Sequence, residues 1–192
     1  MQKSESLQTL DMLGLNTIDY FITKDKAEAT HYLAKHVHER RSMRTERGGE
    51  FGCPFYYDLP GAELLPRALQ HLDEGYKLIF SPSLAWQDSI AFGSIAIVLA
   101  GDDIIEFVHG PGLCRDLEKH PGKQSIILPG GSIAPILASQ HQLAKDLNLL
   151  YKLIKDHCYE LAPCIVEFSY YPYRVGKLSK HFICWELRGY NK

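Results

Sequence analysis

The sequence predicts an α+β fold with mostly antiparallel sheets and flanking helices. Its second half is rich in short apolar, β-branched runs bounded by turn residues, the pattern of strands that follow one another along the chain. Two of these runs, 94–99 and 104–108, are separated by Gly101-Asp102-Asp103, a hairpin turn signal. Helical periodicity occurs in three stretches, which we expect to flank the strands.

Two helices and two strands are expected in the first 75 residues. Residues 17–23 form a β-type run, and Thr23 can cap a helix whose apolar positions follow at helical spacing. A strand at 41–46 leads into a loop rich in Gly and Pro, residues that interrupt regular structure. The second helix is expected to begin near Pro66, since proline suits a first turn, and to end at Gly75.

Strands dominate from Tyr76 onward. Short apolar runs at 76–81 and 124–128 predict two strands beside the hairpin. The longest helical pattern covers 135–161, with its apolar residues on one face. The chain closes with two further apolar runs, 164–171 and 181–187, which we expect to pair as antiparallel neighbours.

Composition restricts the class of protein. With 192 residues, 45% of them hydrophobic, the chain is long enough for one domain with a real core. The net charge of −2 provides no basic field, so nucleic acid is not an expected partner. No apolar run approaches the roughly 20 residues of a membrane helix, and no signal peptide is visible at the N-terminus. Five cysteines without a CxxC pair indicate reduced thiols, so we expect a cytoplasmic protein that binds no membrane.

Three glutamates, Glu106, Glu167 and Glu186, lie in the middle of apolar strands. A buried carboxylate must be paired, bound to metal or protonated, because burying it without a partner is costly. Side chains alternate along a strand, so Glu186 and Arg188 share a face. If the last two strands pair, Glu167 joins them, and two such carboxylates suit Mg²⁺. The alternative is that each glutamate pairs with a nearby Arg or Lys on a half-exposed sheet.

Two other segments have features of a phosphate site. Arg44 and Thr45 lie near the end of a strand that runs into Gly48-Gly49, so a guanidinium and free backbone amides are available to phosphate oxygens. Gly110 and Gly112 follow the Glu106 strand and allow a ligand to approach the backbone closely. A solvated strand edge explains the first segment equally well, and a plain turn explains the second.

Common catalytic signatures are missing from the sequence. It has no GxSxG, no Walker loop and no HExxH or Cys/His zinc spacing. One remaining enzymatic alternative is general acid–base chemistry by His109 beside the Glu106 strand, although nothing in the spacing distinguishes that pair.

Taken in chain order, these motifs resemble the ATP-grasp nucleotide-binding domain of phosphoenolpyruvate synthase and pyruvate phosphate dikinase. Ser42-Met43-Arg44-Thr45 and Gly48-Gly49 are similar to the family's Arg-Ser-Ser type strand end and Gly-rich loop. Gly110-Pro111-Gly112-Leu113 is similar to its Gly-Leu-Gly-Glu type turn. Ile165-Val166-Glu167-Phe168 and Trp185-Glu186-Leu187-Arg188 are similar to its closing Asp-Ile-Glu-Trp and Leu-Gln-x-Arg strands.

The resemblance implies a single ATP-grasp-like domain, residues 1–192, with two small lobes at about 17–75 and 76–188. It implies ATP and Mg²⁺ as cofactors, with Glu167 and Glu186 on the metal and Arg44 and Arg188 as catalytic residues on phosphate oxygens. The nucleotide-binding residues that it implies are Arg44, Thr45, Gly48, Gly49, Gly110 and Gly112.

The chain also departs from the family. Ile165 replaces the aspartate before the family's Ile-Glu, and Lys24 is the nearest candidate for its early phosphate-binding lysine. No segment resembles the swivelling phosphohistidine domain or the phosphoenolpyruvate barrel, so a complete synthase or dikinase is not expected.

Beside acid–base chemistry at His109 and Glu106, the resemblance leaves two functions open. One is an ATP–Mg²⁺-dependent phosphotransferase whose partners are a nucleotide and a protein that carries the phosphoryl acceptor. The other is a catalytically eroded ATP-grasp-like module that binds a nucleotide or a protein partner. Whether the protein is an enzyme, of the phosphotransferase or of the ligase type, is not decided by the sequence.

Overall fold

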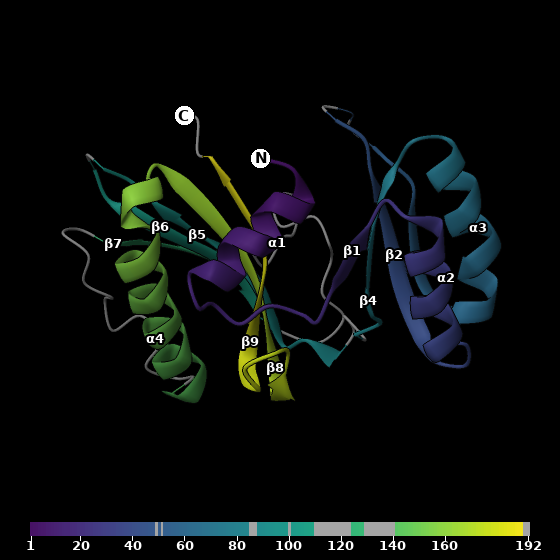
Figure 1. Cartoon of the computed structure of the whole chain (residues 1–192). Coiled ribbons are helices and arrows are strands. Elements are labelled where there is room, and N and C mark those ends of the chain that lie inside the picture. The colour runs from purple at the N-terminus through teal and green to yellow at the C-terminus, as the bar shows by residue number, and fades with distance from the viewer. Residues whose placement is uncertain are drawn as a thin grey trace. The chain divides into compact units, whose positions relative to one another are not determined.

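The computed structural model describes residues 1–48, 50, 52–84, 88–99, 101–109, 124–128 and 141–189. The chain divides into two compact units, whose elements are labelled in Figure 1. The N-terminal unit consists of Gln2–Glu5 and Ile18–Leu84, and the C-terminal unit consists of Met1, Ser6–Thr17 and Ala85–Lys192. Each unit has its own sheet and its own hydrophobic core.

The helices are α1 (Lys3–Met12), α2 (Lys26–Lys35), α3 (Gly61–Asp73), α4 (His141–Cys158) and the 3₁₀ helix η4 (Tyr159–Leu161). The strands are β1 (Phe21–Thr23), β2 (Arg40–Glu46), β3 (Phe55–Pro60), β4 (Lys77–Pro82), β5 (Ala91–Ile97), β6 (Asp103–His109), β7 (Gln124–Leu128), β8 (Cys164–Val175) and β9 (Lys180–Gly189).

The N-terminal unit has a four-stranded antiparallel sheet in the order β1-β4-β2-β3. Helices α2 and α3 lie side by side over one face of this sheet (Figure 1). Met43 of β2 lies opposite Phe80 of β4, and both are fully buried beneath the helices. Because side chains alternate along a strand, Arg44 is on the other face of the sheet from Met43.

The C-terminal unit has a five-stranded antiparallel sheet in the order β7-β6-β5-β8-β9. Helix α4 and the C-terminal part of α1 cover the same face of this sheet (Figure 1). Apolar side chains of both helices, Leu10 and Leu147 among them, pack on Ile95, Phe107 and Val166. One face of β5, β6, β8 and β9 is thereby buried, while the opposite face bears polar residues such as Glu106 and Glu167.

The predicted α+β class with mostly antiparallel sheets is confirmed, and most predicted strands occur within a few residues of their expected bounds. Helix α1 and strand β3 were not predicted. The predicted strand 76–81 corresponds to β4, which pairs with β1 and β2. The units therefore divide after Leu84 rather than after residue 75.

Two helix starts were predicted wrongly. Asp25, not Thr23, caps α2, because its carboxylate accepts the Glu28 N–H at 2.9 Å. Helix α3 begins at Gly61 and contains Pro66 in its interior. Gly61 is required there because a Cβ atom would lie 2.5 Å from the backbone oxygen of His36. The last predicted helix, 135–161, is seen as α4 and η4, and its first residues fall outside the described ranges.

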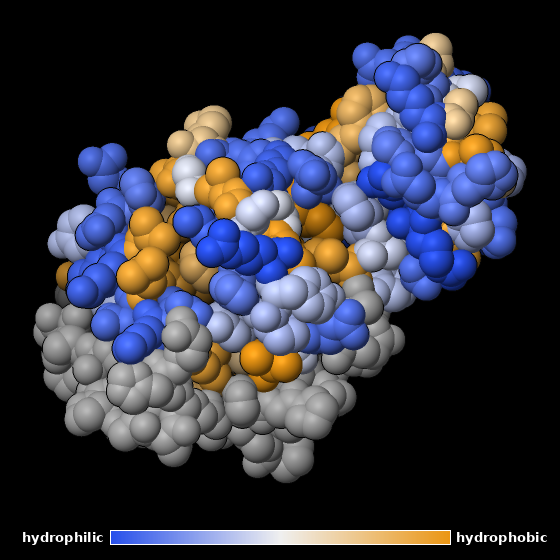
Figure 2. Space-filling view, turned by 90° about the horizontal axis from the view of Figure 1, so that it is seen from below, coloured by the Kyte–Doolittle hydropathy of each residue, from blue (hydrophilic) through white to orange (hydrophobic). Residues whose placement is uncertain are grey.

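The described surface is mixed in character. Figure 2 shows hydrophobic residues interrupted by hydrophilic ones on the face that it presents. Several large apolar side chains are exposed, including Met12, Leu99 and Leu149. Among the described helices, none combines the length and the apolar character needed to cross a membrane.

Candidate functional site

A row of polar side chains crosses the C-terminal sheet on the face away from its core. The register aligns Ser125 of β7 with Glu106 of β6, and Glu106 with Ser94 of β5. Ser94 is opposite Glu167 of β8, which in turn is opposite Glu186 of β9. All three glutamates that the sequence places in apolar strands therefore belong to one cross-strand row. On the same face, the residues two positions before the row on β6 and β8, Ile104 and Ile165, are apolar.

Glu167 and Glu186 are direct cross-strand partners. Side chains in that relation have Cβ atoms about 5 Å apart, within reach of a shared ligand. Arg188 lies on the same face, and its Nη2 is 3.0 Å from Glu167 Oε1. The Arg188 side chain is 52% exposed, so this ion pair is accessible and weak. Glu167 thus lies opposite Glu186 in the sheet, and it also has the nearby basic partner of the alternative interpretation.

A β-bulge lies next to this carboxylate pair. The register places Glu167 opposite Glu186 but Phe168 opposite Cys184, so Trp185 is the extra residue of β9. The indole Nε1 of Trp185 donates a hydrogen bond of 2.7 Å to Ser169 Oγ. Ser169 is two residues from Glu167 on the same face of β8, so Trp185 is an aromatic neighbour of the carboxylates.

Glu106 extends the row towards β7. Its Oε1 accepts a hydrogen bond of 3.2 Å from the Ser125 hydroxyl. Glu106 and Glu167 are separated by one strand, whose residue in the row is Ser94. The sequence singles out Glu106 but gives no sign that Ser94 and Ser125 share its row. That alignment depends on the exact register of two strand pairs, which the intervening turns do not reveal.

The donor set fits Mg²⁺. This cation prefers oxygen ligands and is usually held by one or two carboxylates together with water and phosphate oxygens. Within the described ranges, no group of three or more His, Cys, Asp or Glu side chains can hold a metal ion by itself. A cation at Glu167 and Glu186 would therefore need further ligands, such as water or phosphate oxygens. With three carboxylates and one guanidinium around the row, a divalent cation would also offset negative charge.

The N-terminal unit contains the other predicted phosphate residues. Arg44 of β2 is partly exposed, and its guanidinium carbon lies 5.5 Å from the centroid of the Phe55 ring. Thr45 is buried, and both its N–H and its hydroxyl donate to the Pro54 carbonyl, at 3.0 and 2.9 Å. The hydroxyl of Thr45 thereby closes the loop after β2. Gly48 is exposed in that loop.

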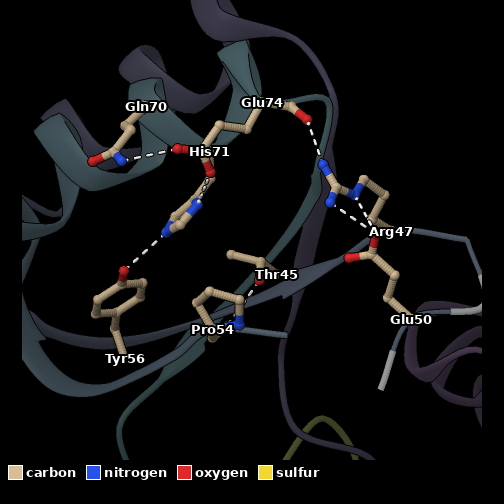
Figure 3. A network of polar contacts seen from close by, with 8 residues as sticks. All are labelled: Thr45, Arg47, Glu50, Pro54, Tyr56, Gln70, His71 and Glu74. Carbon is tan, nitrogen blue, oxygen red and sulfur yellow. Dashed lines mark hydrogen bonds and ion pairs between the residues drawn. The ribbon is translucent and has the colours of Figure 1, made fainter. Parts of the chain in front are cut away.

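A polar network connects this loop to the end of α3 (Figure 3). Arg47 pairs with Glu50 at 2.7 Å and donates to the Glu74 carbonyl at 3.1 Å. His71 is buried between the Glu74 carboxylate, 2.9 Å from Nδ1, and the Tyr56 hydroxyl, 2.8 Å from Nε2. Hydrogen bonds from Gln70 and His71 lower the pKa of the Glu74 carboxyl. These contacts hold the loop that follows β2 against the helix.

The structure thus brings three predicted site residues together, Glu167, Glu186 and Arg188, all on β8 and β9. Arg44, Thr45 and Gly48 belong to the N-terminal unit. Gly49, Gly110 and Gly112 lie outside the described residues.

The sequence and the structure were both compared with those of known proteins. No protein-family model and no curated protein matches the sequence. Among solved structures, PH1788 from Pyrococcus horikoshii Ot3 is similar with a TM-score of 0.61 and 16% identity, over 98% of this chain and 89% of that one. The ATP-grasp ligase of Chryseobacterium gregarium, solved with ADP and a leader and core peptide, is similar with a TM-score of 0.53 and 11% identity, over 96% and 50%. VanG D-Ala:D-Ser ligase from Enterococcus faecalis has a TM-score of 0.53 and 15% identity, over 98% and 52%.

The chain has an ATP-grasp-like fold. It spans about half the length of the two ligases, which at these identities are similar in fold alone. The expected ATP-grasp-like architecture is therefore confirmed. The narrower resemblance to phosphoenolpyruvate synthase remains a hypothesis.

Proposed function

We propose that this protein binds ATP together with Mg²⁺ and that Glu167 and Glu186 hold the cation. One observation carries the proposal: the two carboxylates are direct partners across β8 and β9, on the sheet face away from the core. Mg²⁺ bound there would supply charge neutralisation to a polyphosphate. The ATP-grasp-like fold supports the nucleotide, because similar structures include a ligase solved with ADP.

Arg188 and Arg44 are the proposed ligands of the phosphate oxygens. Arg188 already faces Glu167 at 3.0 Å and can contact phosphate oxygens without leaving the site. Arg44 is proposed as a further phosphate ligand, and Thr45, Gly48, Gly49, Gly110 and Gly112 are proposed as the other nucleotide-binding residues. Catalysis of phosphoryl transfer depends mainly on such positioning and charge stabilisation.

We further propose that the reaction is transfer of a phosphoryl group to an acceptor on another protein, as the resemblance to phosphoenolpyruvate synthase implies. A peptide substrate is consistent with the leader and core peptide in the Chryseobacterium gregarium ligase structure. Formation of ADP that depends on an added acceptor would support this reaction. A protein that binds ATP and Mg²⁺ but forms no ADP with any acceptor would instead be a binding module.

The binding-module alternative also has an observation in its favour. Arg188 neutralises Glu167, and Ile165 takes the place of a family aspartate on the same face. A site that has one ligand fewer, and in which Arg188 competes for Glu167, binds the cation less strongly. The two functions therefore differ in turnover, while both require nucleotide binding.

The proposal predicts that Glu167→Gln lowers the affinity for ATP in the presence of Mg²⁺ by at least about tenfold, because the amide is a neutral and weaker ligand. The affinity for ATP without Mg²⁺ should change little. Isothermal titration calorimetry with ATP, with and without Mg²⁺, measures both values. Glu160→Gln, at an exposed carboxylate of η4, is the matched control and should behave like the unsubstituted protein. Equal Mg²⁺-dependent affinity in Glu167→Gln and the unsubstituted protein would contradict the proposal.

A further inference from the structure

Strand β9, which carries Glu186 and Arg188, lies at the edge of its sheet among the strands that the structure describes. An edge strand presents backbone groups that need partners from outside the sheet. Here the partners come from residues 6–17. Leu187 N donates to Ser6 Oγ at 2.6 Å, and Cys184 N donates to the Asn16 carbonyl at 2.8 Å. The N-terminal segment therefore covers the edge beside the proposed cation site.

Asn16 fixes the other end of the β8–β9 hairpin. Its buried side chain donates to the carbonyls of Val175 and Phe182, at 2.9 and 2.6 Å. Its Oδ1 accepts the N–H of Leu178 at 2.7 Å. These contacts anchor the turn, which is distant along the strands from the carboxylates.

The hydrogen bond between Ser6 and Leu187 differs from the Asn16 contacts because it lies beside the two carboxylates. Leu187 is the residue between Glu186 and Arg188, so the Ser6 hydroxyl holds the backbone that joins the two proposed ligand residues. Ser6 is 1% exposed, and α1 is anchored by Leu10, which is buried in the core of the C-terminal unit. The hydroxyl is therefore held in place by a packed helix rather than by a free loop.

We propose that Ser6 is a positioning residue for the Glu186 and Arg188 side chains, an inference that rests on the proposed function of that site. Because Leu187 is buried in the core, alternation directs Glu186 and Arg188 to the face that Glu167 occupies, and the Ser6 hydroxyl fixes the backbone between them. Without the hydroxyl, a buried N–H at the sheet edge loses its partner, which is costly, and this stretch of β9 opens more often.

The test uses the full chain with Ser6→Ala and two companion variants. Ser6→Thr keeps the hydroxyl and is the conservative rescue. Ser4→Ala removes another buried hydroxyl from α1, one whose partners are Glu46 and Lys77 of the N-terminal unit, and is the matched control. Alanine is a good helix former, so neither alanine variant weakens α1 itself.

Two readouts are measured. The first is hydrogen exchange of the Leu187 amide without ligand, expected to be about tenfold faster in Ser6→Ala and within about twofold of normal in the other two variants. The second is the Mg²⁺ concentration that gives half-maximal ATP binding. We expect this concentration to rise about fivefold in Ser6→Ala and to stay normal in the other two variants. The affinity for ATP without Mg²⁺ should be unchanged in all three. A general loss of stability would instead change both affinities.

The outcomes separate the two claims. Normal Leu187 exchange in Ser6→Ala, or faster exchange with unchanged Mg²⁺ dependence, would overturn the positioning role while leaving the proposed function intact. Absence of Mg²⁺-dependent ATP binding in the unsubstituted protein would overturn the proposed function. It would also overturn the positioning role of Ser6, because there would be no cation site to position.

Discussion

Asp103 shows how a buried carboxylate is kept ionised in this protein. Its side chain accepts hydrogen bonds from Val98 N at 2.9 Å, the Tyr151 hydroxyl at 2.6 Å and Lys155 Nζ at 3.0 Å. Burial by itself would raise the pKa of the Asp103 carboxyl, but these three donors together hold the pKa below its usual value. The charged form is therefore the one that the folded state stabilises.

Asp103→Asn should lower the free energy of unfolding by about 2–4 kcal/mol at neutral pH, because the amide leaves Lys155 and Tyr151 without their shared acceptor. Since folding lowers this pKa, the stabilisation is complete above about pH 4 and is lost as the pH falls through the folded-state pKa. Urea unfolding at several pH values measures both effects. In Asp103→Asn, the free energy of unfolding should fall less on acidification than in the unsubstituted protein. Asp102→Asn, at an exposed neighbour, should keep the full dependence on pH. An unchanged acid dependence in Asp103→Asn would contradict this assignment.

At the scale of single residues, the sequence predicts charged groups in apolar strands but not their partners. Glu106, Glu167 and Glu186 stand out because a carboxylate among Ile, Val and Phe is unusual. The Arg188 pairing follows from alternation on one strand and the pairing of two neighbours. Ser6 and Asn16 were missed because a serine or asparagine near the N-terminus has no local signal that it will meet a strand more than 160 residues away along the chain.

The central strands β5 and β6 illustrate how register depends on one small residue. Gly93 of β5 is opposite Phe107 of β6. A Cβ atom at Gly93 would lie 2.2 Å from the Glu106 carbonyl and 2.7 Å from Phe107 Cβ, so the two strands must separate to admit any side chain. Glu106 belongs to the carboxylate row, and a shift here would disturb that row.

Gly93→Ala should therefore destabilise the C-terminal unit by about 3 kcal/mol or more, since backbone atoms on a central strand cannot move away cheaply. Gly189→Ala is the matched control: Gly189 ends β9, and a Cβ atom there meets nothing within 4 Å. Its effect should stay within about 0.5 kcal/mol. Denaturant midpoints of the two variants provide the comparison. Equal stability of the two variants would show that the β5–β6 contact is looser than described.

At the scale of elements, hydrophobic periodicity predicts the strands and α4 well, because these elements bury one continuous face. Periodicity fails for α1, where the residues that pack, such as Leu7 and Leu10, are interspersed with serines that hydrogen-bond to distant strands. It fails for β3 because this strand is short and at the sheet edge, and it follows a segment rich in Gly and Pro. The bulge at Trp185 also has no sequence signature, although it sets which β9 residues face Glu167.

For the whole molecule, the sequence predicts the α+β class from strand patterns and the ATP-grasp-like fold from the order of short motifs. Sequence comparison alone finds no family, whereas structural similarity at 16% identity or less shows the fold. Proteins that differ from this chain at most positions thus have a similar fold. For the same reason, fold similarity does not identify the acceptor or the reaction, which depend on the site.

The central claim is that Glu167 and Glu186 jointly hold the cation of an ATP–Mg²⁺ complex. The most direct measurement is a crystal structure of the full chain with a non-hydrolysable ATP analogue and Mg²⁺. We expect density for a cation about 2.1 Å from an oxygen of each carboxylate, with phosphate oxygens completing its coordination. Nucleotide bound elsewhere, or a Glu167–Glu186 pair that contacts neither cation nor phosphate, would contradict the claim.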